Sequence, residues 1–155
     1  MSNFTTLFAE IILPIPVGGS FTYRIPNQLI NKAEVGRRAV VQFGKSKIYS
    51  GIIYSIHDKI PETYQVKYIL DIIDDDPIVN SKQLNFWTWI SEYYMCHLGD
   101  VVQAALPSAM KLSSETVINI HPEFDGDISN LNPKELLITN ACCETENIKI
   151  SDIGK

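Results

Sequence analysis

The sequence predicts an α+β chain: a small, mostly antiparallel β-barrel capped by two helices, followed by the truncated start of a winged-helix domain. Three observations lead to this expectation. Residues 7–73 hold five apolar segments, separated by turn residues and without helical periodicity. Residues 81–106 space their apolar side chains as helices do, and a further helix start lies at Asn132-Pro133-Lys134-Glu135. We therefore expect one domain over residues 1–110 and a partial one over residues 111–155.

The five apolar segments read as strands because each ends at residues that stop or reverse a strand. Prolines follow the first segment, and Gly18-Gly19 permits a reversal before the second. Residues 44–47 form the four-residue tip of a hairpin, and Gly51 suggests a bulge or a bend in the returning strand. Residues 27–36 form a polar connection. The expected strands are 7–13, 21–25, 37–43, 48–56 and 66–73.

Two helices should follow an acidic turn at residues 74–76, whose carboxylates we expect to be solvated. Asn80-Ser81 can cap the first helix, Gly99-Asp100 should break it, and the second should span residues 100–106. We expect the tryptophans and tyrosines of the first helix to be core residues, and both helices to plug one side of the barrel. The apolar positions of the first helix are Leu84, Trp87, Ile90, Tyr94 and Leu98.

The second unit begins near residue 111, with Ser113-Ser114 as a linker and a strand over residues 116–120. Asn132 can cap a helix whose apolar stripe is Leu136, Leu137 and Ala141. Ser151-Asp152 could cap another helix, but the sequence ends at Lys155. Two short helices joined by a turn suit a winged helix, so we expect the chain to be a fragment cut inside that domain.

Composition excludes several classes of protein. The chain is 45% hydrophobic and 20% charged, which is ordinary for a globular protein. No apolar run could span a bilayer, and the N-terminus lacks the features of a signal peptide, so we expect a cytoplasmic location and no membrane partner. The three cysteines, Cys96, Cys142 and Cys143, suit free thiols in a reducing compartment.

No catalytic or metal-binding pattern emerges from the titratable residues. Gly44-Lys45-Ser46 is similar to the end of a phosphate-binding loop, but Ala39 stands where that loop needs its first glycine, and strands flank it. The adjacent Cys142 and Cys143 have no second pair and no spaced histidine, which argues against zinc. We therefore expect this chain to be no enzyme, and to hold no metal and no cofactor.

Charge is unevenly distributed along the chain. The net charge is −5 and the isoelectric point about 5.1, which alone would discourage binding to nucleic acid. Residues 30–70, however, carry seven bases against three acids, whereas residues 71–155 carry five bases against fourteen acids. A phosphate responds mainly to charges within about 10 Å, so the basic segment could meet DNA. Charge alone favours the alternative, which is a solvated basic edge of a sheet.

An ordered set of motifs over residues ~7–110 resembles the start of the PriA family, the bacterial replication-restart helicases also called primosomal protein N′. The set begins with Ile11-Ile12-Leu13-Pro14-Ile15-Pro16, Phe21-Thr22-Tyr23 and the run from Gly36 to Lys45. It continues through residues 51–53, 66–70, 75–78, 89–94 and 98–101, and ends with Ala105-Leu106-Pro107. Residues 111–155 resemble, less distinctly, the start of that family's winged-helix domain.

The resemblance implies a pocket for the 3′ end of a DNA strand. The family's pocket aromatic matches Phe21, its turn glycine Gly44, and its lysine before the apolar strand Lys67; its acidic residue falls on Thr22, a departure. Phe21 could stack on a base, and strand parity places Tyr23 on the same face. The residues expected at the 3′ end are Phe21, Thr22, Tyr23, Gly44, Lys45 and Lys67, and those expected on the DNA backbone are Arg37, Arg38 and Lys47.

The resemblance also implies partners and activities of the whole protein. These are forked DNA with a leading-strand 3′ end, single-stranded DNA-binding protein and other primosome components. The family's ATP-dependent motor, with its magnesium, and its zinc-binding insert cannot be carried onto any position of this chain. An alternative is a protein-interaction β-barrel without direct DNA binding, whose docking face is the acidic region 71–155 and the aromatic helix 81–98.

Overall fold

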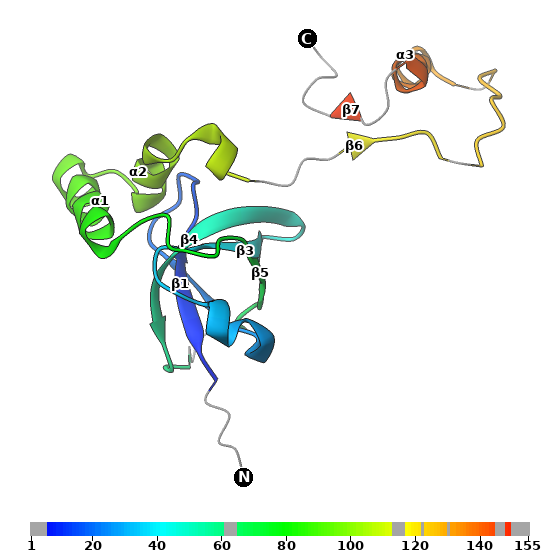
Figure 1. The fold of residues 1–155 in the computed structure, drawn as a ribbon. Coiled ribbons are helices and arrows are strands. Elements are labelled where there is room, and N and C mark those ends of the chain that lie inside the picture. The colour runs from blue at the N-terminus through cyan, green and yellow to red at the C-terminus, as the bar shows by residue number, and fades with distance from the viewer. Residues whose placement is uncertain are drawn as a thin grey trace. The chain divides into compact units, whose positions relative to one another are not determined.

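The computed structural model describes residues 6–60, 65–112, 117–121, 123–129, 131–144 and 148–149 (Figure 1). The chain divides into two compact units, Met1–Ser113 and Ser114–Lys155. The linker expected at Ser113-Ser114 lies outside the described residues.

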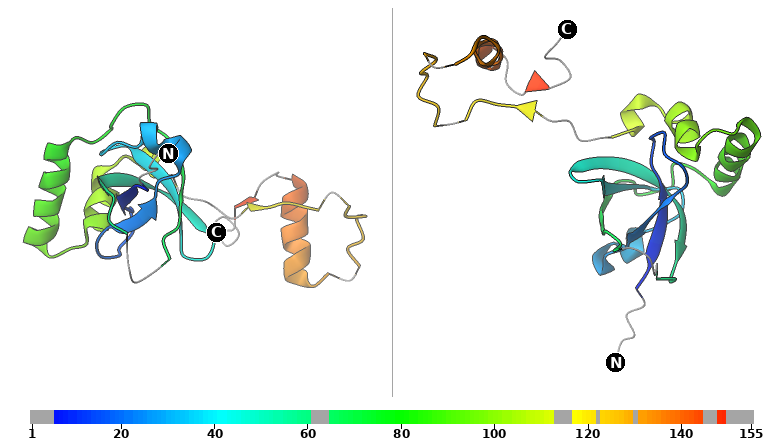
Figure 2. Two further views of the ribbon diagram at one scale, coloured as in Figure 1. Left: turned by 90° about the horizontal axis from the view of Figure 1, so that it is seen from below. Right: turned by 180° about the vertical axis from the view of Figure 1, so that it is seen from behind.

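The first unit is built on a curled, antiparallel, five-stranded sheet with the order β2-β1-β4-β3-β5 (Figures 1 and 2). The sheet comes close to closing on itself, because Arg24 of β2 bridges Tyr68 ahead of β5 and its N–H donates to the Lys67 carbonyl at 2.8 Å. The α+β class is thus confirmed, and the expected barrel is a curled half-barrel. The strands are β1 (Phe8–Ile12), β2 (Phe21–Arg24), β3 (Arg38–Phe43), β4 (Lys47–His57) and β5 (Ile69–Ile72).

The concave side of the sheet holds the main hydrophobic core. Successive side chains of a strand point to opposite faces, so Ile11 of β1, Tyr23 of β2 and Val41 of β3 meet there. A short 3-10 helix, η1 (Asn27–Lys32), adds Leu29 to this core. The sequence pattern predicted only a polar connection at η1.

A second core lies on the opposite face of the sheet, where two helices pack. Ile12 and Ile52, both fully buried, meet α1 (Ser81–Tyr94) and α2 (Leu98–Ala105) there. The helices therefore lie on one side of the curled sheet, where they cover the outer face of β1 and β4. The reason is that β1 and β4 carry apolar residues on both faces, which must be buried on both sides.

The cap of α1 is confirmed, but the predicted helix break is wrong. The Asn80 side chain accepts from the Gln83 N–H, and the Gln83 side chain accepts from the Asn80 N–H. The helix ends at Met95, which has a left-handed backbone with φ +52°. Gly99 lies inside α2, and a Cβ at Gly99 would come 2.0 Å from the Ile15 carbonyl oxygen. This glycine therefore permits close packing and does not end a helix.

The aromatic residues of α1 divide between two faces, which corrects the prediction that they are all core. Trp87 is only 7% exposed, whereas Trp89, Tyr93 and Tyr94 are 52%, 65% and 67% exposed. Of the positions predicted from helical spacing, Leu84 and Trp87 are buried, but Tyr94 is exposed and Leu98 begins α2.

Two local predictions fail because a distant strand decides the geometry. Gly51 is paired regularly with Ala39, and the irregularity of β4 lies instead opposite Glu10 and Ile11 of β1. Asp74 is not simply solvated, since its carboxylate accepts hydrogen bonds from the backbone N–H and the guanidinium of Arg38, the shortest at 2.6 Å.

The second unit contains β6 (Val117–Ile118), α3 (Pro133–Glu144) and β7 (Ile148–Lys149), with β6 and β7 antiparallel. The predicted capping box is confirmed, since the Asn132 side chain accepts from the Glu135 N–H and the Glu135 side chain from the Asn132 N–H. Leu137, expected in the apolar stripe, is 66% exposed. The winged-helix assignment remains a prediction, and the cap expected at Ser151-Asp152 lies outside the described residues.

Candidate functional site

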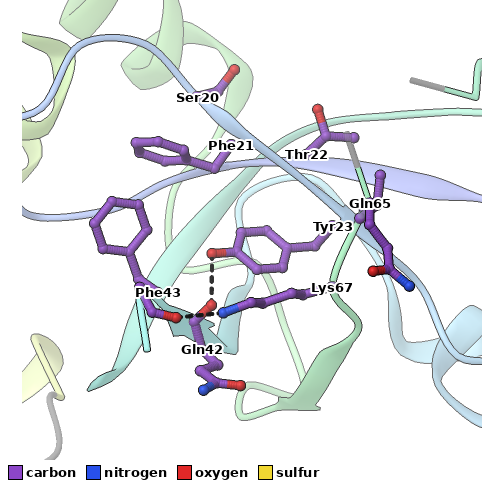
Figure 3. A pocket seen from close by; sticks show the side chains of 10 residues that line it. Ser20, Phe21, Thr22, Tyr23, Gln42, Phe43, Gln65 and Lys67 are labelled. Atoms are coloured by element: carbon purple, nitrogen blue, oxygen red, sulfur yellow. Dashed lines mark hydrogen bonds between the residues drawn. The ribbon is translucent and has the colours of Figure 1, made fainter. Parts of the chain in front are cut away.

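A cavity of about 340 Å³ opens where β2, the β3–β4 turn and the segment before β5 approach one another (Figure 3). Five of the residues expected at the 3′ end line it. These are Phe21, Thr22, Tyr23, Gly44 and Lys67, and the other lining residues are Ser20, Gln42, Phe43, Gln65 and Val66. The structure therefore brings together residues that lie up to 46 positions apart in the sequence.

Two hydrogen bonds connect the three segments around this cavity. The Lys67 ammonium donates to the Gly44 carbonyl, and the Tyr23 hydroxyl donates to the Gln42 carbonyl at 3.1 Å (Figure 3). Lys67 has two further protons with which it can donate to a ligand. An exposed ammonium is thus held at the turn, while its charge can still attract an anion.

The two aromatic residues predicted from strand parity differ in exposure. Phe21 is half-buried and packs edge-to-face against Phe43, with the ring centroids 4.8 Å apart and the planes at 65°. Tyr23 is 4% exposed and belongs to the core, and burial raises the pKa of its hydroxyl to about 12. Phe21 is therefore the ring better placed to meet a ligand, with Phe43 beside it.

Gly44 has the backbone conformation that favours glycine, with φ +67°. No heavy atom lies within 4 Å of the position that a Cβ would take there, so the space around this turn is open. The turn itself is held by the Gln42 side chain, which donates to the Lys45 carbonyl at 2.6 Å. The backbone of the turn can accordingly approach a ligand closely.

The hydroxyl of Thr22 is engaged with a carboxylate from the neighbouring strand. Thr22 stands directly opposite Glu10 in the β1–β2 register, and it donates to Glu10 at 2.6 Å, as Ser20 also does. His57 Nε2 lies 3.2 Å from the same carboxylate. Burial alone would raise the pKa of Glu10, but these hydrogen bonds outweigh it, so that the pKa lies below its usual value. The Thr22 side chain points to the other side of β2 from the Tyr23 ring (Figure 3).

The remaining predicted residues lie outside the lining of the cavity. Lys45 is exposed on the turn that contains Gly44, and Lys47 is exposed at the start of β4. Arg37 forms an ion pair with Glu34 at 2.7 Å, and Arg38 pairs with Asp74. Both arginines therefore form ion pairs within the fold, whereas the two lysines are exposed close to Gly44 in the sequence.

Sequence reasoning missed several residues of the site, above all Phe43. Phe43 could have been predicted from the sequence, because residues 39, 41 and 43 share one strand face and Phe43 ends that strand beside Gly44. No local pattern indicated Gln42 or Gln65. Glu10 could be found only from the register of β1 against β2.

Within the described part of the chain, no cluster of three or more His, Cys, Asp or Glu residues could hold a metal ion. Among the helices of that same part, none has the length and apolar character needed to cross a membrane.

The structure defines a small β-domain whose pocket lies at a sheet edge, and comparison with known proteins identifies its family. The model of one family, described as the 3′ DNA-binding domain (3′BD) of PriA, matches residues 10–107. The chain belongs to this family.

Several curated relatives carry the name replication restart protein PriA. The chain is 31% identical to the protein from Rickettsia felis over 99 residues and 30% identical to that from Buchnera aphidicola of Acyrthosiphon pisum over 105 residues. It is 27% identical to the Bacillus subtilis protein over 117 residues. These matches cover 64%, 67% and 73% of this chain, but only 15%, 14% and 14% of the relatives' own length.

Proposed function

We propose that this chain binds the 3′ end of a DNA strand in the cavity between β2 and the β3–β4 turn. The observation that carries the proposal is the convergence of Phe21, Gly44 and Lys67 on one open cavity, in a chain of the 3′ DNA-binding domain family. A terminal nucleotide offers a base, a sugar and a phosphate, and each has a complementary group there.

The chemistry assigns a role to each part of the cavity. Phe21, supported edge-on by Phe43, stacks on the terminal base, an interaction worth about 1–3 kcal/mol without choice among bases. Gly44 leaves room for the sugar, and Lys67 meets the terminal phosphate. Lys45 and Lys47 follow the phosphates that precede it. Arg37 and Arg38 stabilise the fold through Glu34 and Asp74 and contribute positive charge nearby.

The cavity selects an end because of its walls. The Lys67 side chain reaches across to the Gly44 carbonyl, so the segment 65–67 and the turn are joined on one side of the cavity. A nucleotide inside a strand would have to pass its continuing chain through this wall, whereas a terminal nucleotide would not.

In the cell, this end would be that of the nascent leading strand at a stalled fork. The chain would hold it so that the motor of a whole PriA protein, an ATP-dependent 3′-to-5′ helicase with bound zinc, acts on the fork in the cytoplasm. Single-stranded DNA-binding protein and other primosome components would be partners of that whole protein.

Fluorescence anisotropy with the 155-residue chain tests the proposal. The probe is a single strand that is labelled at its 5′ end and carries a free 3′-hydroxyl. An unlabelled linear strand should displace this probe at lower concentration than an unlabelled circular strand of the same length. Phe21→Ala should weaken binding by roughly 5- to 150-fold, and Lys67→Ala should weaken it and reduce its salt dependence. Lys59→Ala removes an exposed charge outside the cavity lining and should leave binding unchanged. Equal affinity for circular and linear strands would refute end binding.

A matched set of 3′ termini tests selectivity within the same assay. A 3′-phosphate adds bulk where the Lys67 side chain joins the Gly44 turn, so it should bind less tightly than a 3′-hydroxyl. Salt-insensitive binding, or no binding to any DNA, would favour the protein-interaction alternative.

A further inference from the structure

The carboxylate of Glu10 holds the residues on both sides of Phe21, the ring to which the proposed function assigns the terminal base. Ser20 Oγ donates to one carboxylate oxygen at 2.6 Å, and Thr22 Oγ1 donates to the other at 2.6 Å. A carboxylate has two acceptor oxygens, so Glu10 meets both hydroxyls at once. Hydrogen bonds to an ionised acceptor are roughly twice as strong as those between neutral groups. The backbone that carries Phe21 is therefore held before and after the ring.

These two bonds matter because Phe21 lies in the edge strand of the sheet. The sheet has the order β2-β1-β4-β3-β5, and β2 pairs with β1, where Ile11 stands opposite Phe21. On its other side β2 borders the cavity, and the segment before β5 joins it farther along, at Arg24. Ser20 precedes the first residue of β2. Its bond to Glu10 therefore extends the contact between the two segments beyond the strand pairing.

Glu10 is itself held from the strand on the other side of β1. Nε2 of His57, in β4, lies 3.2 Å from the carboxylate, and the His57 ring stacks on that of Phe8 with the centroids 6.1 Å apart. The β1–β4 register shifts between Glu10 and Ile11, and an irregularity of this kind re-aims side chains. The Glu10 side chain is 21% exposed. Its contacts restrict its rotamers, so the carboxylate is a fixed anchor for the two hydroxyls.

The carboxylate acts from behind the ring, since Glu10 is not among the residues that line the cavity. Thr22 and Phe21 are successive residues of a strand, so their side chains point to opposite faces of β2. Phe43 contacts the Phe21 ring edge-to-face, with the centroids 4.8 Å apart. The ring is therefore held through its backbone by Glu10 and through its edge by Phe43.

The charge of Glu10 has the opposite sign to that of a residue that attracts DNA. Its pKa lies below the usual value, so the carboxylate is ionised at neutral pH. A carboxylate repels a nearby phosphate, and removing the charge alone should therefore strengthen DNA binding. A loss of affinity without Glu10 would mean that its hydrogen bonds matter more than its charge. The two effects thus differ in sign and can be separated.

We propose that Glu10 is a positioning residue for DNA-end binding, which acts through Ser20 and Thr22 to place the Phe21 ring for stacking. This role of Glu10 rests on the proposed function, in which Phe21 stacks on the terminal base. A ring that is already in place loses less conformational freedom when a base binds, and affinity rises accordingly. Without the carboxylate, β2 keeps its backbone pairing with β1, but the segment that carries the ring gains freedom.

The anisotropy assay with a 5′-labelled strand tests this role. Glu10→Ala should weaken binding of a free 3′ end by about tenfold, whereas Glu10→Gln, which keeps the shape and one acceptor oxygen, should weaken it by about threefold or less. Asn80→Ala removes the cap of α1, away from the cavity lining, so it should lower stability and leave affinity unchanged. Undiminished affinity of Glu10→Ala would overturn this proposal alone, whereas a lack of end binding by the unchanged chain would overturn the proposed function as well.

A double-variant cycle separates positioning from a general loss of stability. In a chain that already carries Phe21→Ala, the further change Glu10→Ala should weaken binding by no more than about twofold, because the ring that Glu10 positions is absent. An equal loss with and without the ring would overturn the proposal. Ser20→Ala removes one half-buried hydroxyl and allows the same cycle if Glu10→Ala does not fold. It should weaken binding by about threefold when Phe21 is present and leave it unchanged when Phe21 is absent, and an equal loss in both would again refute positioning.

Discussion

Replacing Gly44 by alanine should weaken DNA-end binding in addition to lowering stability. The left-handed backbone at Gly44, with φ +67°, makes a Cβ cost roughly 1–2 kcal/mol in the free energy of unfolding. No packing clash adds to this, since no heavy atom lies within 4 Å of the added carbon. The same carbon would occupy open space at the lining of the cavity, where the sugar is proposed to lie. We expect binding to a 3′ end to weaken at least about tenfold, or about 1.4 kcal/mol.

Gly19 provides the matched control for this substitution. Its φ is +82°, no atom lies within 4 Å of its Cβ position, and it is not among the lining residues. Gly19→Ala should therefore lose similar stability in urea denaturation while keeping full affinity for DNA ends by anisotropy. Equal affinities of Gly44→Ala and the unchanged chain would refute the reasoning, as would an equal loss in both variants.

Three further predictions concern stability measured by chemical denaturation. Asp74→Asn should lower the free energy of unfolding by about 2–3 kcal/mol, because it leaves Arg38 without its charged partner. The Arg38 hydrogen bonds hold the pKa of Asp74 below 3.8, so the ion pair stabilises the unchanged chain above about pH 4 and this stabilisation is lost as pH falls. The variant should lack that loss of stability in acid. Burial raises the pKa of Tyr23 from 10.0 to about 12, so the neutral hydroxyl stabilises the fold below pH 10 and this stabilisation is lost between pH 10 and 12. Tyr23→Phe should remove this fall in the free energy of unfolding at alkaline pH. Gly99→Ala should destabilise by about 3 kcal/mol, since the new Cβ would lie 2.0 Å from the Ile15 carbonyl oxygen.

Much of the first unit could be predicted because its signals are local. The strands follow from alternating side chains that end at proline or glycine, and the Asn80 cap follows from four consecutive residues. Gly99 was wrongly predicted to end a helix. A glycine is needed there because residues 13–15, more than eighty positions away in the sequence, pack closely against it. The strands that the helices cover could not be predicted, because local alternation does not show that both faces of β1 and β4 must be buried.

The site was less predictable than the fold. Phe21, Gly44 and Lys67 have no chemical relation in the sequence, and only the resemblance to a family brought them together. The pairing of Thr22 with Glu10 could not be foreseen, because it depends on the exact register of β1 against β2. A shift by one residue would have placed Glu10 on the other face of the sheet.

The position of the cavity follows from how the sheet nearly closes. β2 and the segment before β5 are joined at Arg24, whose N–H reaches the Lys67 carbonyl. Toward Phe21 they are separated by the cavity, whose two sides are residues 20–23 and 65–67. A barrel that closed fully along β2 would fill this space with strand hydrogen bonds and leave no room for a ligand. The same incomplete closure that exposes a sheet edge therefore creates the site, and the tilt of Lys67 toward the turn gives that site its positive charge.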